Sequence, residues 1–384
     1  MKQRLFVTLS LAGLAMATFG ATKPKTAIKA LNKTTIQQPT YTEWHDLQVN
    51  AINRFPLHTN FFTYPADDWV SEKDGKIVSK DILHMNKTES KYFLSLDGTW
   101  KFNWVANADQ RPTDFYKEDL DDSNWKTMNV PGNWEMNGFG DPEYVNNGFA
   151  WREHFNEQPP AVPTKDNHVG SYRRIIDIPA NWDGKQVVAH FGSVTSNIYL
   201  YVNGKFAGYA EDSKVAAEFD ITPYLKKGKN LIAFQTFRWC DGSWDEDQDF
   251  WRLSGVARES YLFARDAKLQ LEDIRITPDL VNNYKDGVLN ISTKVKGNGK
   301  LNFILFDKDG KQVATATGLA KNGTANITMN VENPHKWNSE TPYLYTLQVS
   351  LSSALKNGNM KSASMTPVKV GFRKVEIKNK QFLV

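Results

Sequence analysis

The chain has 384 residues, which at about 150 residues per domain is enough for two or three domains. Its 47 basic and 43 acidic side chains give a net charge of +4, too small for a dedicated nucleic-acid binder, and its 40% hydrophobic composition excludes a disordered chain. A single cysteine, Cys240, excludes an intramolecular disulfide and a cysteine-rich zinc site.

Residues 1–21 have the features of a secretory signal peptide. Two basic residues near the start precede an uncharged run of apolar and small residues at 5–20, and Ala15 and Ala17 form an A-x-A-like cleavage candidate. The run is shorter than the roughly 20 residues of a transmembrane helix, and no later segment is long and apolar enough to span a bilayer. We therefore expect a secreted or periplasmic bacterial protein, with residues 22–40 as a flexible tether.

Residues 41–266 have the pattern of a β-sandwich. The alternating runs 197–202 and 205–209 flank Asn203-Gly204, a dipeptide that suits a type I′ turn because both central residues need positive φ. We predict a hairpin there. Three more runs are typical of strands: 171–178, 186–191 and 231–239.

Residues 267–374 carry a second set of short strand-like runs. Their number and spacing are typical of an immunoglobulin-like sandwich, without the cysteine pair of antibody domains. Asp309-Gly310 is predicted to close one hairpin. The seven runs are 269–277, 287–295, 301–306, 312–317, 325–331, 344–351 and 368–372.

One segment is unusually acidic, with five carboxylates in nine residues: Asp241, Asp245, Glu246, Asp247 and Asp249. Three interpretations compete: a solvated acidic loop, a loop that lends one ligand to a metal or a sugar, and a catalytic pair. A catalytic pair needs its two carboxyl groups to face each other across a substrate. Since adjacent acids on a β-rich loop point in different directions, spacing alone favours the solvated loop.

Most of the twelve tryptophans are expected to pack in the core or between domains, as large aromatic side chains do in sandwiches. For Trp44 and Trp151 the choice between packing and a sugar-stacking surface is left open. Cys240 is predicted to be a half-buried thiol at a strand end. The tryptophans assigned to packing are Trp100, Trp125, Trp134, Trp239 and Trp251.

Several motifs resemble the first two domains of glycoside hydrolase family 2 β-galactosidases. The loop 159–164 before 170–174 is similar to that of the β-galactosidase branch, which favours a galactoside over a glucuronide or a mannoside. The resemblance implies an all-β fold, with a jelly-roll sugar-binding domain followed by an immunoglobulin-like domain. The motifs that carry it include 96–102, 130–139, 142–146, 202–204, 238–256, 331–334 and 370–373.

The resemblance also implies that catalysis needs a further domain. In the family, a (β/α)8 barrel with both catalytic glutamates begins just after the Gly-Phe-Arg motif, so residues 375–384 are expected to be its truncated start. We expect no catalytic residue in this chain and no activity of the chain alone. The full-length enzyme would hydrolyse terminal β-D-galactosides of an oligosaccharide or glycan with retention. The alternatives are a stand-alone secreted carbohydrate-binding or adhesion protein and a family 2 hydrolase of other sugar specificity.

Three site residues follow from the resemblance. Asp249, in the Asp-Gln-Asp-aromatic-Trp-Arg motif, is implied to bind a sodium ion and galactosyl hydroxyls, with the other sodium ligands in the barrel. A family Val-Asn-Ser loop, whose asparagine approaches the substrate, is Val-Thr-Ser here, so the role passes to Thr195 or Asn197. An ordinary strand edge is the alternative for these two. The resemblance leaves open whether the full-length enzyme also binds a magnesium ion and whether it forms a homo-oligomer.

Overall fold

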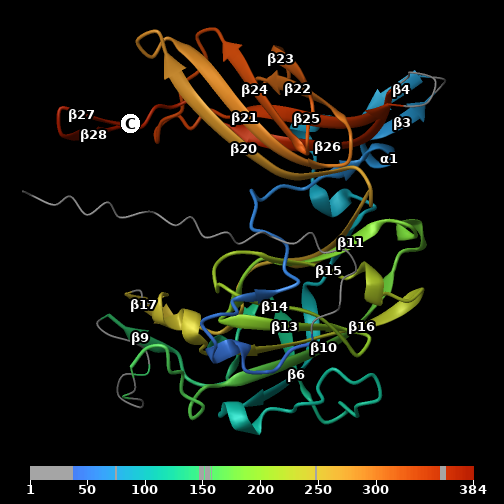
Figure 1. The fold of residues 1–384 in the computed structure, drawn as a ribbon, viewed down its shortest axis with the longest axis vertical. Helices are drawn as coiled ribbons and strands as arrows, with labels where there is room; N and C mark the ends of the chain where they lie inside the picture. The colour runs from blue at the N-terminus through green and yellow to red at the C-terminus, as the bar shows by residue number, and fades with distance from the viewer. Residues whose placement is uncertain are drawn as a thin grey trace, which may run out of the picture. The chain divides into compact units, whose positions relative to one another are not determined.

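The computed structural model describes residues 38–384 except 74–75, 147–150, 152–155, 157, 247–248 and 355–359. The predicted signal peptide and most of the predicted tether, 22–40, lie outside the described residues. The predicted all-β fold is confirmed: the elements are strands and short helices, and the strands form two sandwiches (Figure 1). Among the described residues, no helix combines the length and hydropathy of a bilayer-spanning segment.

The first sandwich is built from a seven-stranded and a four-stranded sheet. The larger sheet has the order β1 (Ala51–Ile52), β14 (Lys205–Glu211), β13 (Asn197–Val202), β16 (Gly228–Phe237), β10 (Val169–Ile178), β6 (Gly98–Val105), β7 (Lys126–Val130). The smaller sheet has the order β15 (Ala217–Asp220), β11 (Gln186–Phe191), β19 (Ser260–Arg265), β5 (Phe93–Ser95).

Two small sheets accompany this sandwich. One is a three-stranded sheet, and the other is a two-stranded ribbon whose strands are labelled together in Figure 1. The three-stranded sheet has the order β12 (Val194–Thr195), β18 (Gly255–Val256), β8 (Gly132–Asn133), and the ribbon pairs β17 (Phe250–Arg252) with β9 (Glu143–Val145). Short 3-10 helices connect the strands, among them Glu43–His45, Ala108–Gln110, Glu135–Asn137, Ala180–Trp182, Thr222–Tyr224 and Asp241–Trp244.

The second sandwich has the immunoglobulin-like arrangement of a three-stranded sheet facing a larger one. The three-stranded sheet has the order β20 (Gln270–Val281), β21 (Asp286–Lys296), β24 (Thr324–Val331). The larger sheet has the order β2 (Tyr64–Pro65), β26 (Met360–Val370), β25 (Tyr345–Ala354), β22 (Lys300–Phe306), β23 (Gln312–Leu319). The remaining elements are α1 (Ala66–Trp69), the hairpin of β3 (Val70–Lys73) with β4 (Lys76–Ser79), the 3-10 helices Ile82–His84 and Lys87–Glu89, and the hairpin of β27 (Glu376–Lys378) with β28 (Gln381–Leu383).

The sequence pattern explains the central strand of the first sandwich. Every residue of β13 is buried, because successive side chains point to opposite faces and both faces are covered. Ile198, Leu200 and Val202 pack in the core between the two sheets, whereas Tyr199 and Tyr201 pack in an aromatic cluster on the other face. The hairpin that follows turns at Asn203-Gly204 with φ values of 49° and 75°, as predicted.

The structure tests the expectations for the tryptophans and the cysteine. Trp100, Trp134 and Trp239 are buried as predicted, Trp125 is partly buried against the aromatic cluster, and Trp44 and Trp151 are buried too. Trp251 does not pack in the core of either sandwich: it is 54% exposed, because β17 belongs to the two-stranded ribbon, and packing against a further domain stays a prediction. The prediction of a half-buried Cys240 is wrong, since its side chain is 1% exposed, beyond the end of β16.

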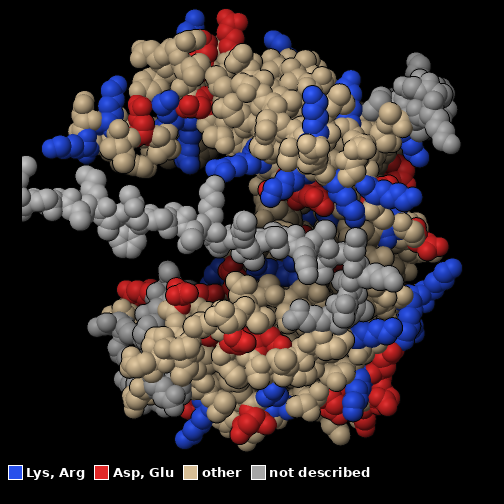
Figure 2. Space-filling view, in the orientation of Figure 1, with Lys and Arg blue, Asp and Glu red and all other residues tan. Residues whose placement is uncertain are grey.

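Charged side chains of both signs are interspersed on the face shown in Figure 2. Figure 2 therefore shows no single continuous basic patch on that face. This agrees with the small net charge of +4.

A buried carboxylate of the first sandwich is held between two histidines. Glu218 in β15 accepts hydrogen bonds from His190 Nδ1 at 2.8 Å and from His58 Nε2 at 2.9 Å. Burial alone would raise the pKa of Glu218, but the two histidine hydrogen bonds outweigh it and lower that pKa to about 2. The other ring nitrogen of His58, Nδ1, lies 2.7 Å from the carbonyl oxygen of Thr59, so only the doubly protonated imidazolium donates to both acceptors.

We predict that this cluster makes stability fall as pH rises. The hydrogen bond to Glu218 raises the pKa of His58, against the opposing effects of burial and of Arg265. In the folded protein His58 therefore keeps a proton that it loses near pH 6.5 in the unfolded chain. The free energy of unfolding declines as the pH rises from about 6.5 through the folded-state pKa of His58. His58→Gln should cost about 1.5–3 kcal/mol at pH 6, as expected for hydrogen bonds to charged groups, and much less at high pH. Urea unfolding at pH 6 and pH 9 measures this, and an equal cost at both pH values would contradict it.

Candidate functional site

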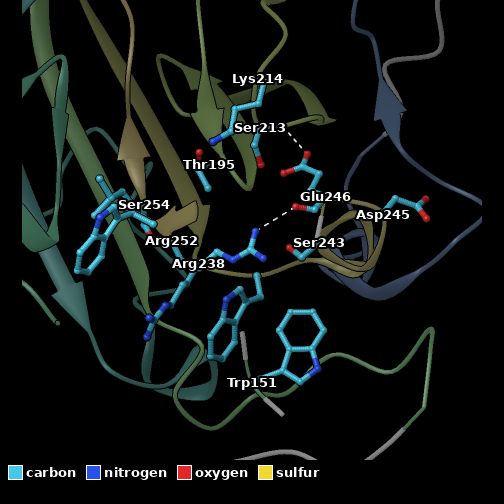
Figure 3. A pocket seen from close by; sticks show the side chains of 13 residues that line it. Trp151, Thr195, Ser213, Lys214, Arg238, Ser243, Asp245, Glu246, Arg252 and Ser254 are labelled. Atoms are coloured by element: carbon cyan, nitrogen blue, oxygen red, sulfur yellow. Dashed lines mark hydrogen bonds between the residues drawn. The ribbon is translucent and has the colours of Figure 1, made fainter. Parts of the chain in front are cut away.

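A pocket that contains the predicted site residue Thr195, called the main pocket below, lies at the end of the first sandwich where β12 and the segments after β16 and β17 meet. Its volume is about 320 Å³, at the lower end of the range for small-molecule sites. Thr195, Ser213 and Lys214 gather on one side, and Trp151 lies on the opposite side (Figure 3). The acidic residues Asp245 and Glu246 also line it.

The acidic loop is fixed to the pocket wall through Glu246. Its Oε1 accepts a hydrogen bond from the backbone N–H of Ser213 at 2.8 Å, and its carbonyl oxygen accepts one from Arg252 Nη1 at 3.1 Å (Figure 3). Asp245 is exposed, as expected for a solvated acid, whereas Asp247 lies outside the described residues. The acids of this segment thus have different environments.

Asp249 lies beside the pocket. The residue is exposed and immediately precedes β17, where its Oδ1 accepts a hydrogen bond of 2.6 Å from Tyr144 Oη. This bond raises the pKa of Tyr144. Tyr144 is the partner of Trp251 across the β9–β17 ribbon, and Trp251 lines the pocket. Asp249 therefore presents a hard oxygen ligand next to the pocket.

The other two predicted site residues are separated by the structure. Thr195 lies in β12 and lines the pocket, and its Oγ1 is buried with no hydrogen-bond partner in the described structure. Asn197 is buried at the start of β13, where its Oδ1 accepts from the backbone N–H of Phe237 at 3.0 Å. Its Nδ2 points to Tyr209 Oη at 3.4 Å. The structure therefore brings Thr195, but not Asn197, to the pocket.

Sequence reasoning missed Ser213 and Lys214 as pocket residues. Ser213 is 0% exposed, and its Oγ has no partner in the described structure. Burial lowers the pKa of Lys214, although the nearby Glu246 carboxylate opposes this. The Asp212-Ser213 dipeptide lies just beyond β14. Its contact with Glu246 joins segments 33 residues apart, so it is visible only in the three-dimensional structure.

A second group of acids is buried behind the loop. Glu211, Cys240 and Asp241 have potential ligand atoms within 4.8 Å of one another. Burial raises the pKa of Glu211 to about 8, and burial also raises the pKa of Cys240. Magnesium prefers ionised oxygen ligands. The neutral thiol of Cys240 beside the proton-binding carboxyl group of Glu211 is therefore a poor site for the magnesium ion considered from the sequence.

The same geometry bears on the idea of a catalytic pair. Asp241 has Glu211 as its carboxyl neighbour, and Tyr209 Oη donates a hydrogen bond to Glu211 Oε1. Both carboxyl groups are more than nine-tenths buried and neither lines the main pocket. This pair is therefore not placed as an acid and a nucleophile on either side of a sugar in that pocket.

Comparison with known families finds two adjacent matches. Residues 93–266 match the domain described as "Glycosyl hydrolases family 2, sugar binding domain", and residues 269–373 match the domain described as "Glycosyl hydrolases family 2". The first match contains β12, β17, Asp249 and the pocket residues that follow Trp151.

Curated relatives and solved structures agree with these matches. A β-galactosidase of Priestia megaterium is 35% identical over 352 residues, which are 88% of this chain and 32% of that protein. The β-galactosidase large subunit of Leuconostoc lactis is 32% identical over 347 residues, 87% of this chain and 52% of that subunit. A Bifidobacterium dentium β-glucuronidase structure shares the fold, with a TM-score of 0.60 at 18% identity over 76% of this chain and 50% of that one. The chain spans about a third of the length of the first curated relatives.

Proposed function

Since the chain belongs to glycosyl hydrolase family 2, we propose that it supplies the two β-sandwich domains of a β-galactosidase, the full-length form of which hydrolyses terminal β-D-galactosides. The observation that carries the proposal is the match of both sandwiches, in order, to relatives named β-galactosidase over 88% of the chain. The solved structures in the comparison include β-glucuronidases, but at 18% identity they support the fold alone.

Within this enzyme, the chain would complete the active site rather than perform the bond cleavage. Retaining hydrolysis uses one carboxyl group as nucleophile and a second as general acid, and the family places both in a barrel domain. The exposed Asp249 carboxylate would accept hydrogen bonds from substrate hydroxyls, and the Tyr144 hydroxyl would fix its orientation through the 2.6 Å bond.

Sodium is compatible with the residues at this position. The Asp249 carboxylate and the Tyr144 hydroxyl are the hard oxygen donors that such a cation prefers. Among the described residues, Asp249 belongs to no group of three or more His, Cys, Asp or Glu side chains with ligand atoms close together. When bound, the ion would supply a positive charge that attracts sugar hydroxyl oxygens. Asp249 is the residue of this chain that would hold it.

The substrate is tested by initial rates of the full-length protein. Aryl β-galactoside, β-glucuronide and β-mannoside are compared at equal concentration. We expect hydrolysis of the galactoside and at most traces with the other two. Preferential hydrolysis of the glucuronide or the mannoside would overturn the proposed substrate.

We also predict export of the protein. Residues 1–21 combine a basic start, an uncharged apolar run and a small-residue cleavage candidate. When the complete chain is expressed in a bacterial host, the product should appear in the periplasm or medium with an N-terminus near residue 18 or 22. Fractionation followed by N-terminal sequencing measures this. A cytosolic product that retains residues 1–21 would contradict it.

A further inference from the structure

Two residues that line the main pocket, Ser213 and Thr195, carry buried hydroxyl groups with no hydrogen-bond partner in the described structure. The backbone of Ser213 is fixed on both sides, because its N–H donates to Glu246 and its carbonyl oxygen accepts from Ser193 Oγ at 2.6 Å. The side-chain Oγ is nevertheless buried and unpartnered in the described structure. The Oγ1 of Thr195 is in the same state, while its carbonyl oxygen accepts from Thr236 Oγ1. Buried hydroxyls normally have partners, so these two point to a hydroxyl-bearing ligand.

The pocket also offers an accessible aromatic surface. Trp251 lines it and is 54% exposed, although large aromatic side chains in this sandwich are otherwise mostly buried. A pyranose ring has one apolar C–H face that packs on an aromatic ring and a rim of hydroxyls that hydrogen-bond. An exposed aromatic ring combined with a few fixed polar groups is the composition of a small-molecule site.

The occupant of this pocket would be a neighbour of the sugar at Asp249. Tyr144 links Asp249 to Trp251 on one face of the β9–β17 ribbon: its hydroxyl donates to Asp249 Oδ1 at 2.6 Å, and its ring centroid lies 5.6 Å from that of Trp251, its cross-strand partner. Trp251 lines the pocket and Asp249 does not. A ligand that extends along this face from Asp249 therefore reaches Trp251 with its next ring.

We propose that the pocket binds the second sugar ring of the substrate, stacked on Trp251 and hydrogen-bonded to Ser213 and Thr195. The inference rests on the proposed function for the identity of the terminal sugar. It predicts that galactosides with a second sugar ring bind more tightly than galactosides without one. The pocket is lined by the acids Asp245 and Glu246 as well as by Lys214 and Arg252, and this mixture of charge favours a neutral ring over an anionic group.

Saturation-transfer NMR on the purified chain tests the proposal with a β-1,4-linked galactosyl disaccharide as probe. We expect transfer to the protons of the non-galactosyl ring, and weaker binding of free galactose. Ser213→Ala should weaken disaccharide binding by about 3- to 10-fold, the loss of one hydrogen bond, and Trp251→Ala should abolish transfer to the second ring. Circular dichroism and thermal unfolding check that each variant is folded.

The matched control is Ser260→Ala. Ser260 is also buried with an unpartnered hydroxyl, but it does not line the pocket, so its removal should leave disaccharide binding unchanged. The proposal is overturned if the chain does not bind the disaccharide, if Ser213→Ala and Ser260→Ala bind it alike, or if inorganic sulfate displaces it. Failure of the galactoside assay on the full-length protein would instead overturn the proposed function.

Discussion

Asp249→Asn in the full-length protein should lower kcat/KM for an aryl β-galactoside by about 10- to 100-fold or more, the scale seen when a metal ligand or its supporting shell is perturbed. The substitution keeps the size of the side chain and removes its charge. It would leave sugar hydroxyls and a cation without their ionised acceptor. Because Asp249 is exposed, the substitution removes no buried packing contact. Steady-state kinetics with and without added sodium measures the effect.

The matched control is Asp245→Asn. Asp245 belongs to the same acidic segment and is exposed too, and although it lines the main pocket, its carboxylate points away from it (Figure 3). Its substitution changes only the local field, so kcat/KM should change little. Equal losses in the two variants would mean that Asp249 acts merely as one charge of an acidic loop.

A second large effect is expected for the chain by itself, which should not hydrolyse aryl β-galactosides above the level of a mock preparation. General acid–base catalysis alone contributes about 10²- to 10⁴-fold. Of the two acids that line the main pocket, Glu246 is held by the Ser213 backbone and the Asp245 carboxylate points away from the pocket (Figure 3), so the two are not placed as an acid and a nucleophile. The assay uses the purified chain at high concentration with a long incubation. Turnover that co-purifies with the chain and is lost on unfolding would contradict the prediction.

The strands could be predicted from local pattern, because alternation and turn residues reflect short-range geometry. The hairpin at Asn203-Gly204 and the run 186–191 lie where the sequence indicated. The two-residue strands β1 and β2 were not predicted, since each exists only through pairing with a distant partner, β14 and β26. Strand β26 begins at Met360 rather than at 368, because its first half is polar and gives no apolar alternation.

The site was less predictable than the fold. Asp249 came from a motif, and its place beside the pocket agrees with the expectation without testing the role. Asn197 was a reasonable candidate by proximity in sequence, yet its amide is used inside the sandwich by Phe237. The spacing of residues in the sequence could not identify Ser213 as a pocket residue. Its place beside the acidic loop depends on the hydrogen bond from its backbone N–H to Glu246, and its hydroxyl has no partner in the described structure. Such contacts between distant segments leave no periodic signal in the sequence.

The most direct test of the account is complementation. The proposed barrel domain of the full-length protein is produced separately, and its hydrolysis of an aryl β-galactoside is measured with and without the chain described above. The account predicts activity only when both are present, and much less activity when the chain carries Asp249→Asn. Equal activity without the chain, or full complementation by the Asp249→Asn chain, would contradict the claim that these two sandwiches complete the active site.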